Sequence, residues 1–421
     1  MNVLIVGSGA KEYTLAKMIS EDSKIDMVFV APGNNAIAEF ANCVDIKANN
    51  VDELLDFAKA NLIDLTIASS EQAVVHGIAD KFNEEGLMIF SPTVDAARIC
   101  TSKSVGKKFM YKTKIPTPKF GIFDRENMAV DYARKAKYPL VIKTDNHLPG
   151  ENTIFCESFK AAKKVIEDSF VNFNKKIVIE DFVCGQEFSF YVITDGYNAM
   201  PLNSVVPYKY ALDGNGGLIT SGIGAYAPFY MLNSELESRI FKQIVYPALD
   251  ELAKNDNHYI GILGIDMIID NSGKINVLEF NSFFQEPDAQ CVLGLIDENI
   301  IDVMRAAIVG SLVDDFREIR SLPQSAASVV LTAGNYPVTI KRGSLITGLE
   351  ELDDDIVLAH FNTIKNTDLN YETSGGRVMV LTGIASTLSA AVQKVYEHTD
   401  IIKFDGKKFR NDIGKKLIVG C

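Results

Sequence analysis

Three oxygen-bearing side chains are spaced so that they could share one divalent cation. Glu279 and Asn281 alternate along an apolar stretch, so they point to one face if that stretch is a strand. Asp266 lies in the preceding apolar stretch, and the turn 270–273 would fold the two stretches into a hairpin. Carboxylate and amide oxygens suit Mg²⁺ or Mn²⁺ when nucleotide phosphates complete the shell. The alternative, a solvated hairpin face, is disfavoured by the apolar neighbours of Asp266.

Two further groups could meet a nucleotide. Lys143 ends the apolar run 140–142, where an ammonium is either a surface lysine or a phosphate contact. Glu180 and Glu187 flank the short connection 181–185, which could offer backbone groups to adenine and a carboxylate to ribose hydroxyls. Taken alone, this second pattern has little specificity.

The glycines near the N-terminus have two interpretations. A strand that runs into Gly7-Ser-Gly9 is similar to a dinucleotide fingerprint, but Glu12 stands where its third glycine would be, and strand two ends in Ala31-Pro32. Both departures count against a nicotinamide oxidoreductase. The loop could hold a phosphate or polar ligand at a helix N-terminus with Lys11 as counter-charge, or it could only permit a tight turn.

These residues need strands and helices to bring them together. The first hundred residues alternate apolar runs with helical patterns in the order β-α-β-α-β-α-β, which predicts a doubly wound parallel sheet with its crevice at the strand ends. Strands are expected over 3–6, 27–30, 65–68 and 88–90, and helices over 13–20, 51–61 and 73–85.

The remaining chain predicts a mixed α/β arrangement. A helix over 102–112 leads into a proline-containing connector, 115–118, that marks a boundary. Then follow a β-rich stretch, a glycine-rich loop over 213–224, a helix over 234–253 and the hairpin 262–281. The last ninety residues predict strands near 328–333, 357–361 and 376–383 and a helix over 387–396.

Composition limits the function classes. The 421 residues have a formal net charge of −13 and are 47 % hydrophobic, which is typical of a globular protein and argues against broad binding to nucleic acid or an anionic membrane. No apolar run approaches the ~20 residues of a membrane span. Six scattered cysteines predict reduced thiols and a cytoplasmic protein.

Nearly the whole chain, in order, resembles the glycinamide ribonucleotide synthetase family of the ATP-grasp ligases. Single pieces are short, but their order and spacing together are specific. The resemblance rests on Val6-Gly-Ser-Gly-Ala-Lys-Glu12, Ala31-Pro-Gly33-Asn34, Ser102-Lys103, Val141-Ile-Lys143, Val178-Ile-Glu-Asp-Phe182, Gly185-Gln-Glu187, Gly224-Ala-Tyr226, Leu278-Glu-Phe-Asn281, Gly375-Gly-Arg-Val378 and Arg410-Asn-Asp-Ile-Gly414.

The resemblance implies three domains: a substrate-binding Rossmann-like domain (1–101), an ATP-grasp domain (102–325) whose part 120–192 clamps ATP, and a small C-terminal lid (326–421). It implies ATP-dependent joining of glycine to 5-phosphoribosylamine, a monomer or weak dimer, and no nucleic-acid or membrane partner. Carried over by position, the metal ligands are Glu279 and Asn281, to which the hairpin pattern adds Asp266. The expected ATP contacts are Lys103, Lys143, Glu180, Asp181, Phe182, Val183 and Glu187. The expected substrate residues are Gly9, Lys11, Glu12, Gly33, Asn34, Glu71, Gly222 and Asp288, and Lys143, Glu279, Asn281 and Arg377 are expected to serve catalysis.

Some positions depart from the family pattern. Glu151 replaces the lysine of its flexible A-G-K-G loop, and Phe283 replaces an arginine that follows the metal-binding strand. The loops 206–222 and 283–288 are also changed, while Asp266 adds an acid where the family commonly has a small or apolar residue. Two other hypotheses therefore stay open: a ligase for another amine or carboxylate, and a non-catalytic family member.

Overall fold

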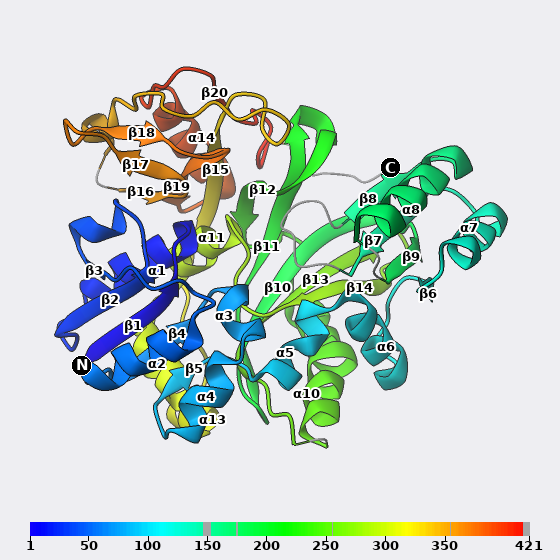
Figure 1. Cartoon of the computed structure of the whole chain (residues 1–421), viewed down its shortest axis with the longest axis horizontal. Coiled ribbons are helices and arrows are strands. Elements are labelled where there is room, and N and C mark those ends of the chain that lie inside the picture. Colours follow the sequence, from blue (N-terminus) through cyan, green and yellow to red (C-terminus); the bar gives the residue numbers. More distant parts are fainter. Residues whose placement is uncertain (146–152, 174–175, 255, 354, 416–421) are drawn as a thin grey trace.

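The computed structural model describes residues 1–145, 153–173, 176–254, 256–353 and 355–415 (Figure 1). The N-terminal sheet and the C-terminal strands of the central sheet lie at one end of the molecule, and a small α/β lobe lies at the other end. The central strands connect these parts.

The N-terminal sheet is parallel throughout, in the order β3-β2-β1-β4-β5, which is the doubly wound arrangement that the sequence predicts. Its elements are β1 (Asn2–Gly7), α1 (Ala10–Ser20), β2 (Met27–Pro32), η1 (Ile37–Glu39), β3 (Asn42–Cys43), α2 (Val51–Ala60), β4 (Leu65–Ala68), α3 (Glu71–Val75), α4 (Ile78–Glu84), β5 (Ile89–Phe90) and α5 (Val94–Thr101). The single helix expected over 73–85 is wrong: Gly77 adopts φ +80°, and this left-handed residue separates α3 from α4.

The small lobe is an antiparallel sheet in the order β6-β9-β7-β8, with α7 and α8 packed beside it. Helix α6 precedes the small lobe in the chain. The lobe has its own apolar cluster, which includes Leu140, Ile142 and Ile179. The elements are α6 (Lys103–Thr113), β6 (Phe120–Phe123), α7 (Glu126–Lys135), β7 (Leu140–Thr144), β8 (Thr153–Cys156), α8 (Phe159–Phe173) and β9 (Ile177–Asp181).

The central sheet has the strand order β14-β13-β10-β11-β12-β15-β19-β16, with β20 paired to β15. The strands of its first part are β10 (Gly185–Asp195), β11 (Ala199–Leu212), β12 (Gly216–Ala227), β13 (Ile260–Asp270) and β14 (Ile275–Asn281). The helices of this part of the chain are η2 (Asp213–Asn215), α9 (Ser234–Ile240), η3 (Phe241–Val245), α10 (Tyr246–Ala253), α11 (Asp288–Leu295), α12 (Ile300–Val309) and α13 (Leu312–Asp315). The loop expected over 213–224 is wrong for most of its length, because only 213–215 turn and β12 pairs with β11. Backbone pairing outweighs the weak strand propensity of glycine there.

The C-terminal strands continue this sheet, since β15 pairs with β12. The expected strands form within β15 (Ser325–Ala333), β16 (Ile356–His360) and β19 (Arg377–Ala385), and the expected helix forms as α14 (Leu388–Thr399). The structure adds the short elements η4 (Leu349–Glu351), β17 (Thr363–Lys365), β18 (Tyr371–Thr373) and β20 (Lys407–Lys408). The C-terminal part is therefore built onto the sheet edge by backbone hydrogen bonds.

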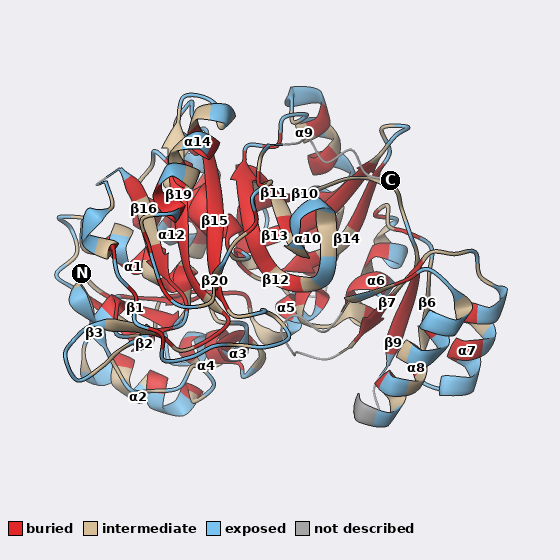
Figure 2. Cartoon of the chain, turned by 90° about the horizontal axis from the view of Figure 1, so that it is seen from above, coloured by how far each residue is buried: buried red, intermediate tan, exposed pale blue. Residues whose placement is uncertain are grey.

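Figure 2 shows that buried residues concentrate in the strands, while α2, α4, α7 and α8 turn exposed faces outward. No helix among the described residues is both long and apolar enough to cross a membrane.

Candidate active site

A cavity of about 480 Å³ lies where the N-terminal sheet, the small lobe and the central sheet meet. One end is lined by apolar and aromatic side chains, including Val141, Phe155, Phe182 and Leu278. The remaining lining is strongly charged, with side chains of both signs: Lys11, Glu71, Lys103, Lys143, Glu180, Asp181, Glu187, Lys209, Asp266, Glu279, Glu286, Asp288 and Arg377.

The hairpin of β13 and β14 brings the expected metal ligands to this cavity. Asp266 lies opposite Glu279 and Gly264 opposite Asn281, and all three polar side chains line the cavity. Asp266 is buried; its Oδ1 accepts from Ser189 Oγ and its Oδ2 from Lys209 Nζ, each at 2.8 Å. The predicted hairpin is confirmed, and the metal-binding role of these residues stays a prediction.

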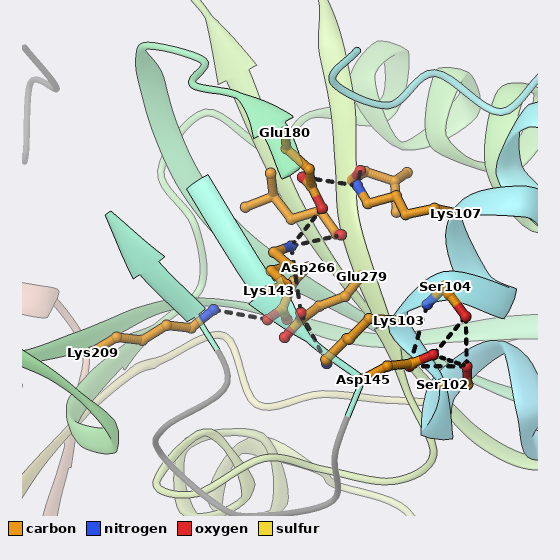
Figure 3. A network of polar contacts seen from close by, with 12 residues as sticks. Ser102, Lys103, Ser104, Lys107, Lys143, Asp145, Glu180, Lys209, Asp266 and Glu279 are labelled. Atoms are coloured by element: carbon orange, nitrogen blue, oxygen red, sulfur yellow. Dashed lines mark hydrogen bonds and ion pairs between the residues drawn. The ribbon is translucent and has the colours of Figure 1, made fainter. Parts of the chain in front are cut away.

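Lysines surround the same carboxylates (Figure 3). Lys103 Nζ lies 3.0 Å from Glu279 Oε2, and Lys143 Nζ lies 3.6 Å from the same oxygen. Lys143 is buried and also pairs with Glu180 at 3.3 Å, so it is not a surface lysine. Burial opposes ionisation of Glu279, but Lys103, Lys143 and Lys209 hold its pKa well below the usual range.

A second buried lysine, Lys107, also pairs with Glu180. Lys107 on α6 lies 3.1 Å from Glu180 Oε2 and donates to Thr117 Oγ1 at 2.7 Å. Burial lowers the pKa of Lys107 to about 8, against the opposing effect of Glu180. Sequence reasoning missed Lys107, because only the packing of α6 against β9 brings it to Glu180.

The segment after β9 borders the apolar end of the cavity. Asp181, Phe182 and Val183 line it, and the Phe182 ring packs against Phe155 with centroids 5.1 Å apart. Glu187 pairs with Lys209 at 2.5 Å. Cys184 is disulfide-bonded, so the expectation of reduced thiols is wrong at this position.

Glu286 links three parts of the chain at the other end of the cavity. Its Oε1 accepts from the Lys11 backbone N–H at 2.8 Å, and its Oε2 lies 3.0 Å from Arg377 Nη2. Arg377 also donates to the carbonyls of Ser221 and Glu286. Sequence reasoning missed Glu286, although it precedes the predicted Asp288 in the stretch that the resemblance covers.

Gly222 lines the cavity, and the backbone at Glu286 comes so close to it that only glycine fits there. It adopts φ +103°, and a Cβ there would lie 2.2 Å from the carbonyl oxygen of Glu286. Any side chain would therefore push β12 away from the Glu286 loop.

Asp288 lies deep beside the metal-ligand candidates. It accepts from Tyr191 Oη at 2.8 Å, and burial, followed by the nearby charge of Asp266, raises its pKa to about 7. Phe283 is 4 % exposed and packs on Phe284 in an apolar cluster. The altered loop 149–152, with Glu151, lies outside the described residues.

Four predicted substrate residues do not line the cavity: Gly9, Glu12, Gly33 and Asn34. The Glu12 carboxylate is buried, accepting from the Gly9 N–H and Ser69 Oγ, and burial raises its pKa. Asn34 accepts from two N–H groups at the start of η1 and donates to the Ser8 carbonyl. These side chains shape the loops, whereas Lys11, Glu71, Gly222 and Asp288 line the cavity.

The donor set fits a hard divalent cation. Asp266, Glu279 and Asn281 offer oxygen ligands, and among the described residues the buried Asn281 Nδ2 has no hydrogen-bond partner. Because an amide can rotate to exchange its nitrogen and oxygen, this position can present the oxygen to a cation. In the described part of the chain no three His, Cys, Asp or Glu side chains cluster as a metal site.

Comparisons with known proteins match nearly the whole chain. The family models "Phosphoribosylglycinamide synthetase, N domain", "ATP-grasp (A) domain" and "C domain" match residues 1–100, 101–289 and 326–416. Phosphoribosylamine–glycine ligases of Pseudomonas aeruginosa and Neisseria meningitidis serogroup A are 36 % and 34 % identical over 99 % of this chain, which covers 98 % and 100 % of them.

Solved structures agree on the fold. The crystal structure of a phosphoribosylamine–glycine ligase from Thermotoga maritima has a TM-score of 0.83 and 23 % identity, covering 98 % of this chain and 100 % of that one. A biotin carboxylase from Campylobacter jejuni, solved with β,γ-ATP, has a TM-score of 0.73 and 15 % identity, covering 97 % of this chain and 92 % of that chain.

Proposed function

The chain belongs to the phosphoribosylglycinamide synthetase family, and we propose that it is an ATP-dependent ligase joining glycine to 5-phosphoribosylamine. The products are glycinamide ribonucleotide, ADP and phosphate, as a step of purine biosynthesis. The observation that carries the proposal is one cavity with an apolar end for adenine, a charged middle for phosphates and a polar end built from all three matched parts.

The reaction needs two transfers in this cavity. A carboxylate oxygen of glycine attacks the terminal phosphorus of ATP, so ADP leaves and an acyl phosphate forms. The amine of phosphoribosylamine then attacks the acyl carbon, and phosphate leaves as the amide forms. Such transfers depend mostly on orientation and on charges already in place, and this site provides both through buried, paired side chains.

Each group has a proposed role. Mg²⁺ or Mn²⁺, held by Asp266, Glu279 and Asn281, would neutralise phosphate charge. Lys103 and Lys143 would contact phosphates, the segment Glu180–Val183 adenine, and Glu187 ribose. Lys11, Glu71, Gly222, Asp288 and Arg377, with Glu286 added, would surround the two substrates. Domain boundaries at 101 and 325, a mobile 120–192 segment, a cytoplasmic location and a monomeric or weakly dimeric state stay predictions.

The test is ADP release from purified protein with ATP, Mg²⁺, glycine and freshly made phosphoribosylamine. We expect ADP only when both substrates are present, with equimolar glycinamide ribonucleotide by mass spectrometry. Glu279→Gln should abolish turnover, whereas the exposed Glu318→Gln should not alter it. Equal ADP release without glycine, or none at all, would contradict the proposal.

A ligase for another carboxylate or amine is the second candidate. It is favoured by Phe283, a buried apolar residue where the family pattern has an arginine. A screen of amino acids and amines for ADP release decides between the two: a pair that exceeds glycine and phosphoribosylamine in kcat/KM would establish the second candidate.

A further inference from the structure

The C-terminal segment Arg410–Gly414 has no part in the proposed function so far. Arg410 is 1 % exposed and is among the largest fully buried side chains of the described residues. Its Nε and Nη2 donate to the two oxygens of Asp412, each at 2.7 Å. This two-point pairing compensates the buried charge and fixes the orientation of the guanidinium.

The segment holds the residues on both sides of Lys209. Arg410 Nη1 donates to the Tyr210 carbonyl at 3.0 Å, and its guanidinium carbon lies 4.8 Å from the centre of the Tyr208 ring. The Gly414 N–H donates to Tyr208 Oη at 2.9 Å. The residues directly before and directly after Lys209 are therefore both anchored, Tyr208 through its side chain and Tyr210 through its backbone carbonyl.

The same segment also contacts the turn and the second strand of the β11–β12 hairpin. Asp412 accepts from the Gly214 N–H, and the Asn411 N–H donates to Asp213, both at 2.8 Å. Ile413 fills the space beside Gly224, where a Cβ would lie 2.4 Å from its Cδ1. These contacts hold the hairpin turn and its second strand against the C-terminal segment.

Lys209 stands between the proposed metal ligands and the substrate end. Its ammonium lies 2.8 Å from Asp266 and approaches it from the side opposite Lys103 (Figure 3). On its backbone side, Thr220 Oγ1 donates to the Lys209 carbonyl and accepts from the Gly222 N–H at the substrate end. Lys209 therefore lies next to both the proposed metal ligands and the substrate end of the cavity.

The Lys209 ammonium can still donate a hydrogen bond to a bound phosphoryl group. An ammonium has three N–H donors, and Glu187 and Asp266 are its acceptors among the described side chains. The Lys209 side chain is 28 % exposed and lines the cavity, so a bound anion can reach it.

We propose that the segment Arg410–Gly414 is a positioning element that fixes Lys209 against the terminal phosphoryl group of a bound nucleoside triphosphate. The inference rests on the proposed function only in that ATP occupies this cavity. Lys209 is the group that touches the phosphoryl, and Arg410 acts through the Tyr208 ring and the Tyr210 carbonyl. A cation held in advance stabilises charge without reorganising during the transfer.

Nucleotide binding with EDTA present tests the phosphate contact without metal or substrates. Isothermal titration compares ADP with the β,γ-imido analogue of ATP. In Lys209→Met we expect about 5- to 10-fold weaker binding of the analogue, the loss of one charged contact, and a change below about 2-fold for ADP. No loss, or equal loss for both nucleotides, overturns the proposal.

Arg410→Lys tests the positioning role, because it keeps the charge but removes the two-point fork. We expect a smaller loss of the same kind, for the analogue and not for ADP. The double variant Arg410→Lys/Lys209→Met should bind no more weakly than Lys209→Met alone. Losses that multiply, or that affect ADP equally, indicate a merely structural role and overturn the proposal.

Two further variants complete the design. Arg342→Lys makes the same exchange at an exposed C-terminal arginine whose Nε donates to the Ser374 carbonyl, and it should leave both affinities unchanged. If Arg410→Lys does not fold, Ile413→Ala loosens the same segment without touching the guanidinium, and it should reproduce the selective loss. Because only nucleotides are used, failure of glycine or phosphoribosylamine as substrates leaves this result interpretable.

Discussion

The Glu286 carboxylate and the Arg377 guanidinium meet at 3.0 Å and join the end of the metal-site hairpin to the C-terminal strands. The other oxygen of Glu286 accepts from the Lys11 N–H at the start of α1. One side chain thus connects three parts of the chain at the substrate end of the cavity.

A double-mutant cycle should reveal strong coupling within this pair. Both side chains are largely buried, with 13 % and 15 % exposure, so Glu286→Gln and Arg377→Met should couple by about 1–3 kcal/mol in urea unfolding. The exposed pair Lys24–Asp302 is the control, and its coupling should be much weaker, because solvent screens the two charges. Equal coupling energies in the two cycles would contradict the role given to Glu286.

Gly222→Ala should damage the site through a steric clash as well as through backbone strain. The added Cβ would meet the Glu286 carbonyl at 2.2 Å, so we expect at least a 10-fold loss of kcat/KM and a lower Tm. Gly214→Ala is the matched control, since Gly214 also has positive φ, +66°, but no atom of the described residues lies within 4 Å of the place that its added methyl would take. Comparable losses in both variants would assign the effect to backbone conformation alone.

Lys107→Met should destabilise the protein strongly. Removing one partner leaves the buried Glu180 with Lys143 as its remaining cation among the described side chains, and breaking a buried pair typically costs about 3–5 kcal/mol. Lys112→Met, which removes a 66 % exposed lysine from the same helix α6, should cost below about 1 kcal/mol. Chemical denaturation measures both, and a small loss for Lys107→Met would argue against a tightly paired Glu180.

We expect the protein to lose stability in mild acid, because the buried His360 resists protonation. Burial lowers its pKa to about 4, between the rings of Tyr13 and Tyr371. Between pH 6.5 and 4 the unfolded chain binds more protons at this residue than the native state, so unfolding free energy falls as pH falls, by up to about 3 kcal/mol.

The measurement is the denaturation midpoint from pH 7 to pH 4 for wild type and His360→Gln. The variant should show a shallower decline, whereas His76→Gln, at an exposed histidine, should follow the wild type. Parallel curves for His360→Gln and wild type would show that this residue does not titrate in the expected window.

The sequence by itself determined the elements and the faces of the site. Alternation along 275–281 put Glu279 and Asn281 on one face, and the turn 270–273 brought Asp266 opposite Glu279, because both features depend on local backbone geometry. Local patterns missed the break at Gly77 and the pairing of β12, where backbone conformation and a neighbouring strand outweigh propensity.

Only the tertiary structure decided which charge meets which. Lys209 could be read as one lysine in an altered loop, yet packing places it between Glu187 and Asp266 and anchors its neighbours through Arg410, 200 residues beyond Tyr210. Glu286 likewise meets Lys11 across 275 residues. The physical reason is that periodicity fixes the direction of a side chain within its own strand or helix, whereas its partners depend on how remote elements pack together.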